Sequence, residues 1–129
     1  MPTLTTLTAA APIAFVPTTR AEEARAYFVD VLGLRLEADD GFALVFDAGG
    51  TMLRVVRVEQ HTPAGYTILG WGVDDIHASV DELSGRGVSF ERYGFLEQDA
   101  AGVWTAPGGT LVAWFKDPDG NTLSLTQFV

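Results

Sequence analysis

The order of the predicted elements repeats once along the chain, and this repeat restricts the fold more than any other feature. Both halves place an apolar segment before an amphipathic one, and short apolar segments separated by turns follow. The two amphipathic segments end alike: VLGLRLE at residues 31–37 and GRGVSFE at residues 85–91 each close a helix with glycine and open a strand. The chain is therefore predicted to fold as two similar βαβββ units.

The first unit is predicted to cover residues 13–58. It opens with a strand at residues 13–18, an apolar run with proline close to either end. A helix is predicted over residues 20–33, because apolar side chains recur there at helical spacing up to a glycine: Ala24, Phe28, Val31 and Leu32. We expect Phe28 and Leu32 to be buried against the sheet. Three further strands are expected at residues 34–37, 42–47 and 52–58.

The second unit is predicted to cover residues 66–129, after a polar, turn-rich linker at residues 59–65. A strand at residues 67–73 leads to a helix at residues 76–83, which Asp74 or Asp75 can cap. Further strands are expected at residues 88–93, near 103–106, at 110–116 and at 122–128. We therefore expect an α+β fold in a single domain over residues 1–129. In it, two βαβββ repeats form a cup-shaped mixed β-sheet with the helices outside, and the cup can enclose a ligand.

Composition and charge narrow the partners that this chain can bind. With 129 residues, of which 47% are hydrophobic, the chain can bury the core of one domain. Eight Lys and Arg against seventeen Asp and Glu give a formal charge of −9, which argues against nucleic acid as a partner. The absence of cysteine excludes disulfides and thiolate chemistry and is compatible with a reducing cytoplasm, where we expect the protein to reside.

We expect no membrane segment and no signal peptide. No apolar run is long enough to span a bilayer. Residues 1–12, MPTLTTLTAAAP, lack the basic start and the continuous apolar stretch of a signal peptide. They are predicted to form a leader or the start of a strand.

Several motifs, taken in order, resemble one known family. The run AYFVDVLGL, the VDDI step into the second helix, the ELSGRGVSF ending and the terminal FKDPDGNTLSL are similar to the vicinal oxygen chelate superfamily. That superfamily includes glyoxalase I, extradiol dioxygenases, and fosfomycin and bleomycin resistance proteins. The resemblance covers nearly the whole chain, from Ile13 to Val129. It implies a paired βαβββ fold, often a dimer, and in the enzymes a divalent metal held by His, Glu or Gln side chains on four strands.

The positions that correspond to these metal ligands can be identified in this chain. They fall on Ile13, or on Phe15 if the register shifts by two, and then on Arg54, Ile68 and Ser124. Divalent ions require oxygen, imidazole or thiolate donors, which this set of side chains does not supply. We therefore predict no metal site and no cofactor. The two histidines, His61 and His77, lie outside the predicted cup strands and are expected to have structural or surface roles.

The predicted cup is apolar, with one cation and a few hydroxyls. Strand alternation predicts that Ile13, Phe15, Arg54, Ile68 and Ser124 share its inner face, and these residues are the candidate ligand-binding set together with Trp104 and Trp114. The sequence does not fix which face the tryptophans occupy, and core packing is favoured over ligand contact for them. Arg54 is expected either to bind a ligand carboxylate or aromatic ring, or to pair with an internal Asp or Glu. The DPDG segment, residues 117–120, is interpreted as a type I turn.

The resulting hypothesis is a metal-independent small-molecule binding protein, similar in kind to the bleomycin resistance proteins and forming a homodimer. No catalytic residue is identified, because Ser124 has no histidine on a facing strand to act as its base. The alternative is an enzyme of the superfamily, a lyase, isomerase or dioxygenase with metal donors not recognised here or with Arg54 as electrophile. A third possibility is a protein whose cup is only filled core and which acts through its dimer surface.

Overall fold

The computed structural model describes residues 6–129. The first half contains η1 (Leu7–Ala9), β1 (Ile13–Thr18), α1 (Ala21–Ala26), the π-helical turn η2 (Tyr27–Val31), β2 (Arg35–Asp39), β3 (Ala43–Ala48) and β4 (Thr51–Arg57). The second half contains β5 (Thr67–Gly72), α2 (Ile76–Gly85), β6 (Trp104–Thr105), β7 (Leu111–Lys116) and β8 (Thr122–Gln127). The predicted order of strands and helices is thus largely confirmed.

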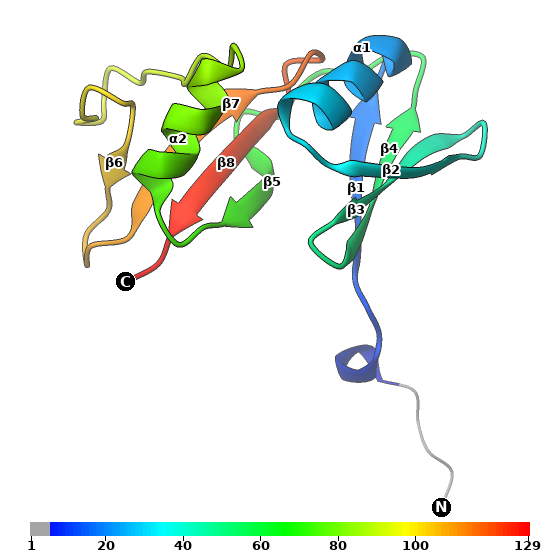
Figure 1. The fold of residues 1–129 in the computed structure, drawn as a ribbon, viewed down its shortest axis with the longest axis horizontal. Coiled ribbons are helices and arrows are strands. Elements are labelled where there is room, and N and C mark those ends of the chain that lie inside the picture. Colours follow the sequence, from blue (N-terminus) through cyan, green and yellow to red (C-terminus); the bar gives the residue numbers. More distant parts are fainter. Residues whose placement is uncertain (1–5) are drawn as a thin grey trace, which may run out of the picture.

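The strands form two four-stranded mixed sheets with the same topology. The first sheet has the order β1-β4-β3-β2 and the second the order β5-β8-β7-β6. In each sheet the first strand pairs in parallel with the last, and the remaining pairs are antiparallel. Figure 1 shows the sheets side by side, each with its own helix, and they do not close into a barrel. The predicted α+β fold of paired βαβββ units is confirmed.

The helices cover one face of each sheet, and the core lies beneath them. In the first half, Phe28 is fully buried and its ring lies 5.6 Å from that of Phe46 on β3. In the second half, Ile76 and Val80 of α2 are buried with Phe115 of β7. Most buried apolar side chains of both halves belong to one apolar cluster. Because side chains alternate along a strand, each sheet has a second face that its helix does not cover.

The first helix differs from the prediction at its C-terminal end. Its α-helical part stops at Ala26 and continues as the wider η2 turn. Phe28 is buried as expected, whereas Leu32 is only half-buried. Leu32 lines a groove against the second half instead of packing wholly on its own sheet. The prediction was correct for the first of these two side chains only.

The predicted strand at residues 88–93 is wrong, because this segment forms a loop. Its backbone groups are bound by the Gln98 side chain: Nε2 donates to the carbonyl of Glu91 at 2.9 Å, and the amide of Tyr93 donates to Oε1 at 2.8 Å. The Glu91 amide donates to the Trp114 carbonyl of β7 at 2.8 Å, so the segment keeps one backbone hydrogen bond to the sheet and side-chain bonds elsewhere. Three strands therefore follow α2, as three follow the helical segment of the first half.

The DPDG turn fastens the second half to the first, a role that the prediction of a plain turn missed. The amide of Gly120 donates to the carbonyl of Asp117 at 2.9 Å, and Gly120 has a φ of +83°, a conformation that glycine adopts without strain. The Asp119 carboxylate accepts hydrogen bonds from the Thr18 hydroxyl and from the amide and hydroxyl of Thr19. We call this set of bonds the Asp119 clasp.

A second residue after the turn strengthens this connection. The Asn121 side-chain amide donates to the carbonyl of Pro17 at 3.0 Å and to the Asp117 carboxylate at 2.9 Å. In addition, the Tyr27 hydroxyl donates to the carbonyl of Lys116 at 3.1 Å. The end of β1 is therefore held by polar groups that lie about a hundred residues further along the chain.

Two expectations concern the N-terminal segment and the membrane. Of the predicted leader at residues 1–12, residues 1–5 lie outside the described part of the chain, and residues 6–12 are exposed and include η1. Figure 1 shows η1 apart from both sheets. No helix within residues 6–129 is long and apolar enough to cross a membrane.

Candidate ligand-binding site

The open face of the first sheet carries exposed apolar side chains. On β1, the exposed fractions are 48% for Ile13 and 59% for Phe15, and on β4 Met52 is 43% exposed. Ile13 lies beside Met52 in the sheet, and Phe15 lies beside Arg54. The predicted common face of Ile13, Phe15 and Arg54 is therefore consistent with this register, and in the isolated chain it is in contact with solvent.

Arg54 pairs with an acidic residue of its own half. Its Nη2 donates to the Asp40 carboxylate at 2.7 Å, and the side chain is 25% exposed. Asp40 lies in the turn between β2 and β3, where its other oxygen accepts the amides of Phe42 and Ala43. The Arg54 guanidinium and these two amides hold the pKa of Asp40 below its ordinary value. Of the two roles expected for Arg54, the structure shows the internal pair, and the guanidinium remains accessible at the rim.

The open face of the second sheet is aromatic. Trp114 of β7 is the ladder partner of Ser124 of β8, and its ring lies 5.9 Å from that of Trp104. Both tryptophans are half-buried on this face and lie outside the apolar core cluster, so the favoured core packing is not observed. Gly70 of β5 is the other partner of Ser124, and a Cβ at position 70 would stand 2.8 Å from the Ser124 Oγ. Glycine therefore lets β5 and the buried Ser124 side chain approach closely.

Further aromatic side chains extend this face into a hollow that the sequence analysis missed. The ring of Tyr93 lies 5.5 Å from that of Trp114, edge to face, and 5.7 Å from that of Phe95. Together with Tyr66 they line a hollow of about 180 Å³. Tyr93 and Phe95 belong to the loop that was predicted to begin as a strand, and the run RYGF, residues 92–95, was the available signal.

The hydroxyl of Tyr93 adds a polar group to this aromatic surface. Burial raises its pKa, and the neighbouring Glu91 carboxylate raises it further. The hydroxyl therefore stays protonated at physiological pH and is able to donate a hydrogen bond to a bound molecule.

Ile68 is the one predicted cup residue that the strand register does not align with the others. The pairing of β5 with β8 shifts between Thr67 and Leu69, so Ile68 lies at a bulge without a partner of its own. It packs against the apolar core as a half-buried side chain. Because a bulge inserts one extra residue, the strict alternation assumed from the sequence fails here.

The residues at the family's metal positions do not fit a divalent ion. Ile13 and Ile68 have no donor atoms, Arg54 is a cation engaged with Asp40, and Ser124 offers a single hydroxyl. Within residues 6–129, no three His, Cys, Asp or Glu side chains gather into a group that could hold a metal. The histidines bind polar side chains elsewhere: His61 contacts the Asn121 Oδ1 at 2.5 Å, and His77 contacts Asp99 at 2.7 Å.

Comparison with known protein families agrees with the two-unit architecture. The model of the Glyoxalase/Bleomycin resistance protein/Dioxygenase superfamily matches residues 9–125. The chain belongs to this superfamily. A search of curated proteins gave no match.

Solved structures of the superfamily share the fold at low sequence identity. A superfamily member from Sphaerobacter thermophilus is 24% identical over 93% of this chain and 98% of that chain, with a TM-score of 0.73. TnmS3, an antibiotic binding protein from Streptomyces sp. CB03234, is 24% identical over 94% and 98% of the two chains, with a TM-score of 0.63. Lactoylglutathione lyase from Agrobacterium tumefaciens is 19% identical over 92% and 93%, with a TM-score of 0.67. These similarities show the fold alone; one of the three proteins is an antibiotic binding protein and another is a lyase.

Proposed function

We propose that this protein binds a small molecule without a metal, on the aromatic face of its second sheet. The observation that carries the proposal is the cluster of Trp104, Trp114 and Tyr93 above the hollow, on the face where Ser124 replaces a metal-binding carboxylate. Aromatic rings supply a large apolar contact area with little loss of side-chain entropy, and they favour flat ligands. The antibiotic binding protein TnmS3, which has the same fold, lends this proposal support.

The chemistry of the face favours a neutral or cationic aromatic compound. The protein carries a formal charge of −9, which disfavours an anion on approach. In the hollow itself, Thr67, Thr122 and the Tyr93 hydroxyl accompany the aromatic rings. A few polar groups of this kind orient a ligand that is otherwise held by apolar contact.

The open face of the first sheet supports a homodimer as the working form. Ile13, Phe15 and Met52 are large apolar residues that remain 48%, 59% and 43% exposed. A second copy that covers them would remove this surface from water and complete the cup. In this proposal the whole chain acts as one domain in the cytoplasm, with residues 59–65 as the linker between its halves.

The first experiment measures metal content and thermal unfolding of the purified protein. Because no described position supplies a set of metal donors, we expect no stoichiometric divalent ion and no change in Tm after chelator treatment. A tightly bound ion at one per chain would contradict the proposal and would favour an enzyme of the superfamily.

The second experiment screens flat aromatic compounds for a rise in Tm, which reports binding to the folded state. Hits are repeated with Trp114→Ala. Loss of the rise in this variant would place the ligand on the aromatic face, whereas an unchanged rise would exclude that face as the site.

A further inference from the structure

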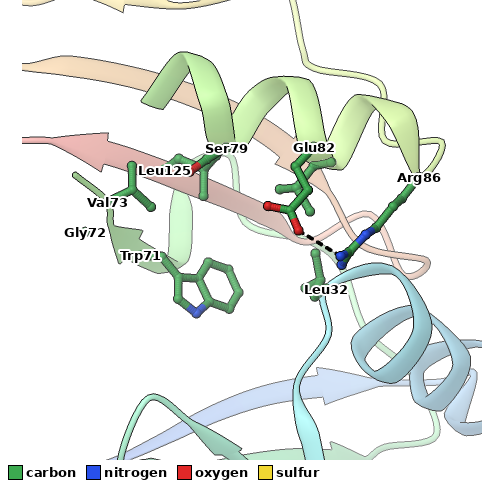
Figure 2. Close-up of a pocket in the computed structure, with 9 residues that line it drawn as sticks. Leu32, Trp71, Gly72, Val73, Ser79, Glu82, Arg86 and Leu125 are labelled. Atoms are coloured by element: carbon green, nitrogen blue, oxygen red, sulfur yellow. Dashed lines mark hydrogen bonds and ion pairs between the residues drawn. The ribbon is translucent and has the colours of Figure 1, made fainter. Parts of the chain in front are cut away.

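A groove separate from both open faces lies between the two halves, on the helix-covered side of the second sheet. Leu32 from the first half forms one wall, and α2, β5 and β8 form the others through Ser79, Trp71 and Leu125. Figure 2 shows the Trp71 ring and Leu32 on one side of the opening and α2 along the other. The groove has a volume of about 200 Å³.

The floor of the groove is apolar and held in place. The Trp71 ring is stacked against the buried Phe115 ring, with centroids 6.3 Å apart and planes inclined by 21°. Leu32, Leu83 and Leu125 complete the apolar lining. An apolar protein cavity of about 150 Å³ is large enough to hold benzene. The groove therefore has room for one aromatic ring with a small substituent.

The rim of the groove carries a fixed ion pair. The Arg86 guanidinium donates to the Glu82 carboxylate at 2.7 Å and to the carbonyl of Val31 at 2.9 Å, so it links α2 to the first half. Figure 2 shows this pair at the edge of the groove, above Leu32. Because the two charges lie side by side, the rim has no net charge, although it still offers hydrogen-bond donors and acceptors.

We propose that this groove is a second small-molecule site, for an uncharged aromatic ring that carries one hydroxyl or amide group. The ring lies on Trp71 and contacts the leucines, and the polar group hydrogen-bonds to Glu82 or Ser79. Because the charges of Arg86 and Glu82 largely cancel, the rim gives an ion no net attraction to offset the loss of its hydration, so neutral compounds are favoured. A ligand in this position touches both halves and stabilises their relative placement. The site goes beyond the proposed function, which concerns the opposite face of the second sheet.

Phenol is a suitable probe, with the tryptophan indole N–H signals of ¹⁵N-labelled protein as the readout. The Trp71 signal is assigned by its loss in Trp71→Phe. We expect phenol to shift this signal in a saturable way. Ser79→Leu places bulk into the groove and should weaken the binding about tenfold or more, equivalent to about 1.4 kcal/mol. Ser84→Leu makes the same change on α2 at a position that does not line the groove, and it should bind as the wild type does.

Three results would overturn the proposal. They are a Trp71 shift that does not saturate up to the solubility of phenol, an unchanged affinity in Ser79→Leu, and shifts confined to the signals of Trp104 and Trp114. If Ser79→Leu does not fold, as judged by its thermal unfolding, Leu32→Phe fills the groove from the first half and carries the same expectation. Trp114→Phe should leave phenol binding in the groove unchanged, so failure here and failure of the proposed function are distinguishable.

Discussion

The open faces of the two sheets differ in chemistry although the sheets share one topology. The first presents separate apolar side chains, among them Phe15, and the half-exposed pair of Arg54 with Asp40. The second presents aromatic rings in mutual contact around Trp114, beside a hollow. The two sheets therefore share a backbone topology, and the side chains on each open face determine what that face can contact. We infer that a second copy of the chain covers the first face and that the second face binds the small molecule.

The largest expected effect separates the two faces by matched truncations. Trp114→Ala removes a half-buried ring that contacts Tyr93 and Trp104, so it should lower the free energy of unfolding by about 2–3 kcal/mol and abolish ligand binding. Phe15→Ala removes a ring that is mostly exposed, and at low protein concentration it should change that free energy by at most about 0.5 kcal/mol. Chemical denaturation measures both.

The Phe15 variant should instead change association. If a second copy covers the first face, Phe15→Ala will shift sedimentation toward the monomer. Trp114→Phe should have the same association state as the wild type. Equal stability losses in the two alanine variants, or a wild type that sediments as a monomer at all concentrations, would remove the distinction between the faces.

A smaller effect is expected at the Asp119 clasp, which holds the two sheets in their relative positions. Asp119→Ala removes three hydrogen bonds in a partly solvated place and should destabilise the protein by about 1–2 kcal/mol at pH 7. Asp81→Ala removes an exposed carboxylate from α2 as a control, with an expected change within about 0.5 kcal/mol. A similar loss in both variants would mean that the clasp contributes nothing specific.

The effect of Asp119 should depend on pH. Burial alone would raise the pKa of Asp119, but hydrogen bonds from Thr18 and Thr19 outweigh burial and lower it. A carboxyl whose pKa is lowered in the folded state stabilises the fold at pH values above its pKa in the unfolded state, which is about 3.9. This stabilisation is lost as the pH falls through the pKa of the folded state. The difference between wild type and Asp119→Ala should therefore shrink below about pH 4. Burial raises the pKa of Asp117, which acts in the opposite sense in both proteins, and the Asp119 carboxylate raises it further in the wild type alone.

The smallest effect on stability is expected for Arg54→Ala. Its ion pair with Asp40 is half-exposed, and pairs of this kind contribute little to folding. Arg57→Ala is the matched control, since Arg57 lies on the same strand, alternates to the other face and pairs with Asp39 at 2.8 Å. Both variants should lower Tm only slightly. A loss of ligand binding in Arg54→Ala alone would extend the site to the first sheet, and binding equal to the wild type would confine it to the second.

The elements that the sequence predicted well are those set by local pattern. The apolar run at β1, the helical spacing around Phe28 and the glycine-bounded strands of the first half all lie close to their predicted places. Turn residues and side-chain periodicity act within a few residues of the chain, so they can be recognised without a structure. The residue types at the family's metal positions can also be read from the sequence, so Ser124 was sufficient to predict that no metal ligand stands there.

The tertiary structure decided the features that depend on partners distant along the chain. The loop at residues 88–93 is bound through Glu91 and Tyr93 to the Gln98 side chain, and the bulge at Ile68 follows from the pairing of β5 with β8. The common face of Trp104 and Trp114, the pairing of Arg54 with Asp40 and the Asp119 clasp also join separate segments. Hydrogen bonds and ring contacts of this kind act over a few ångströms in space, and only the folded chain brings their partners that close.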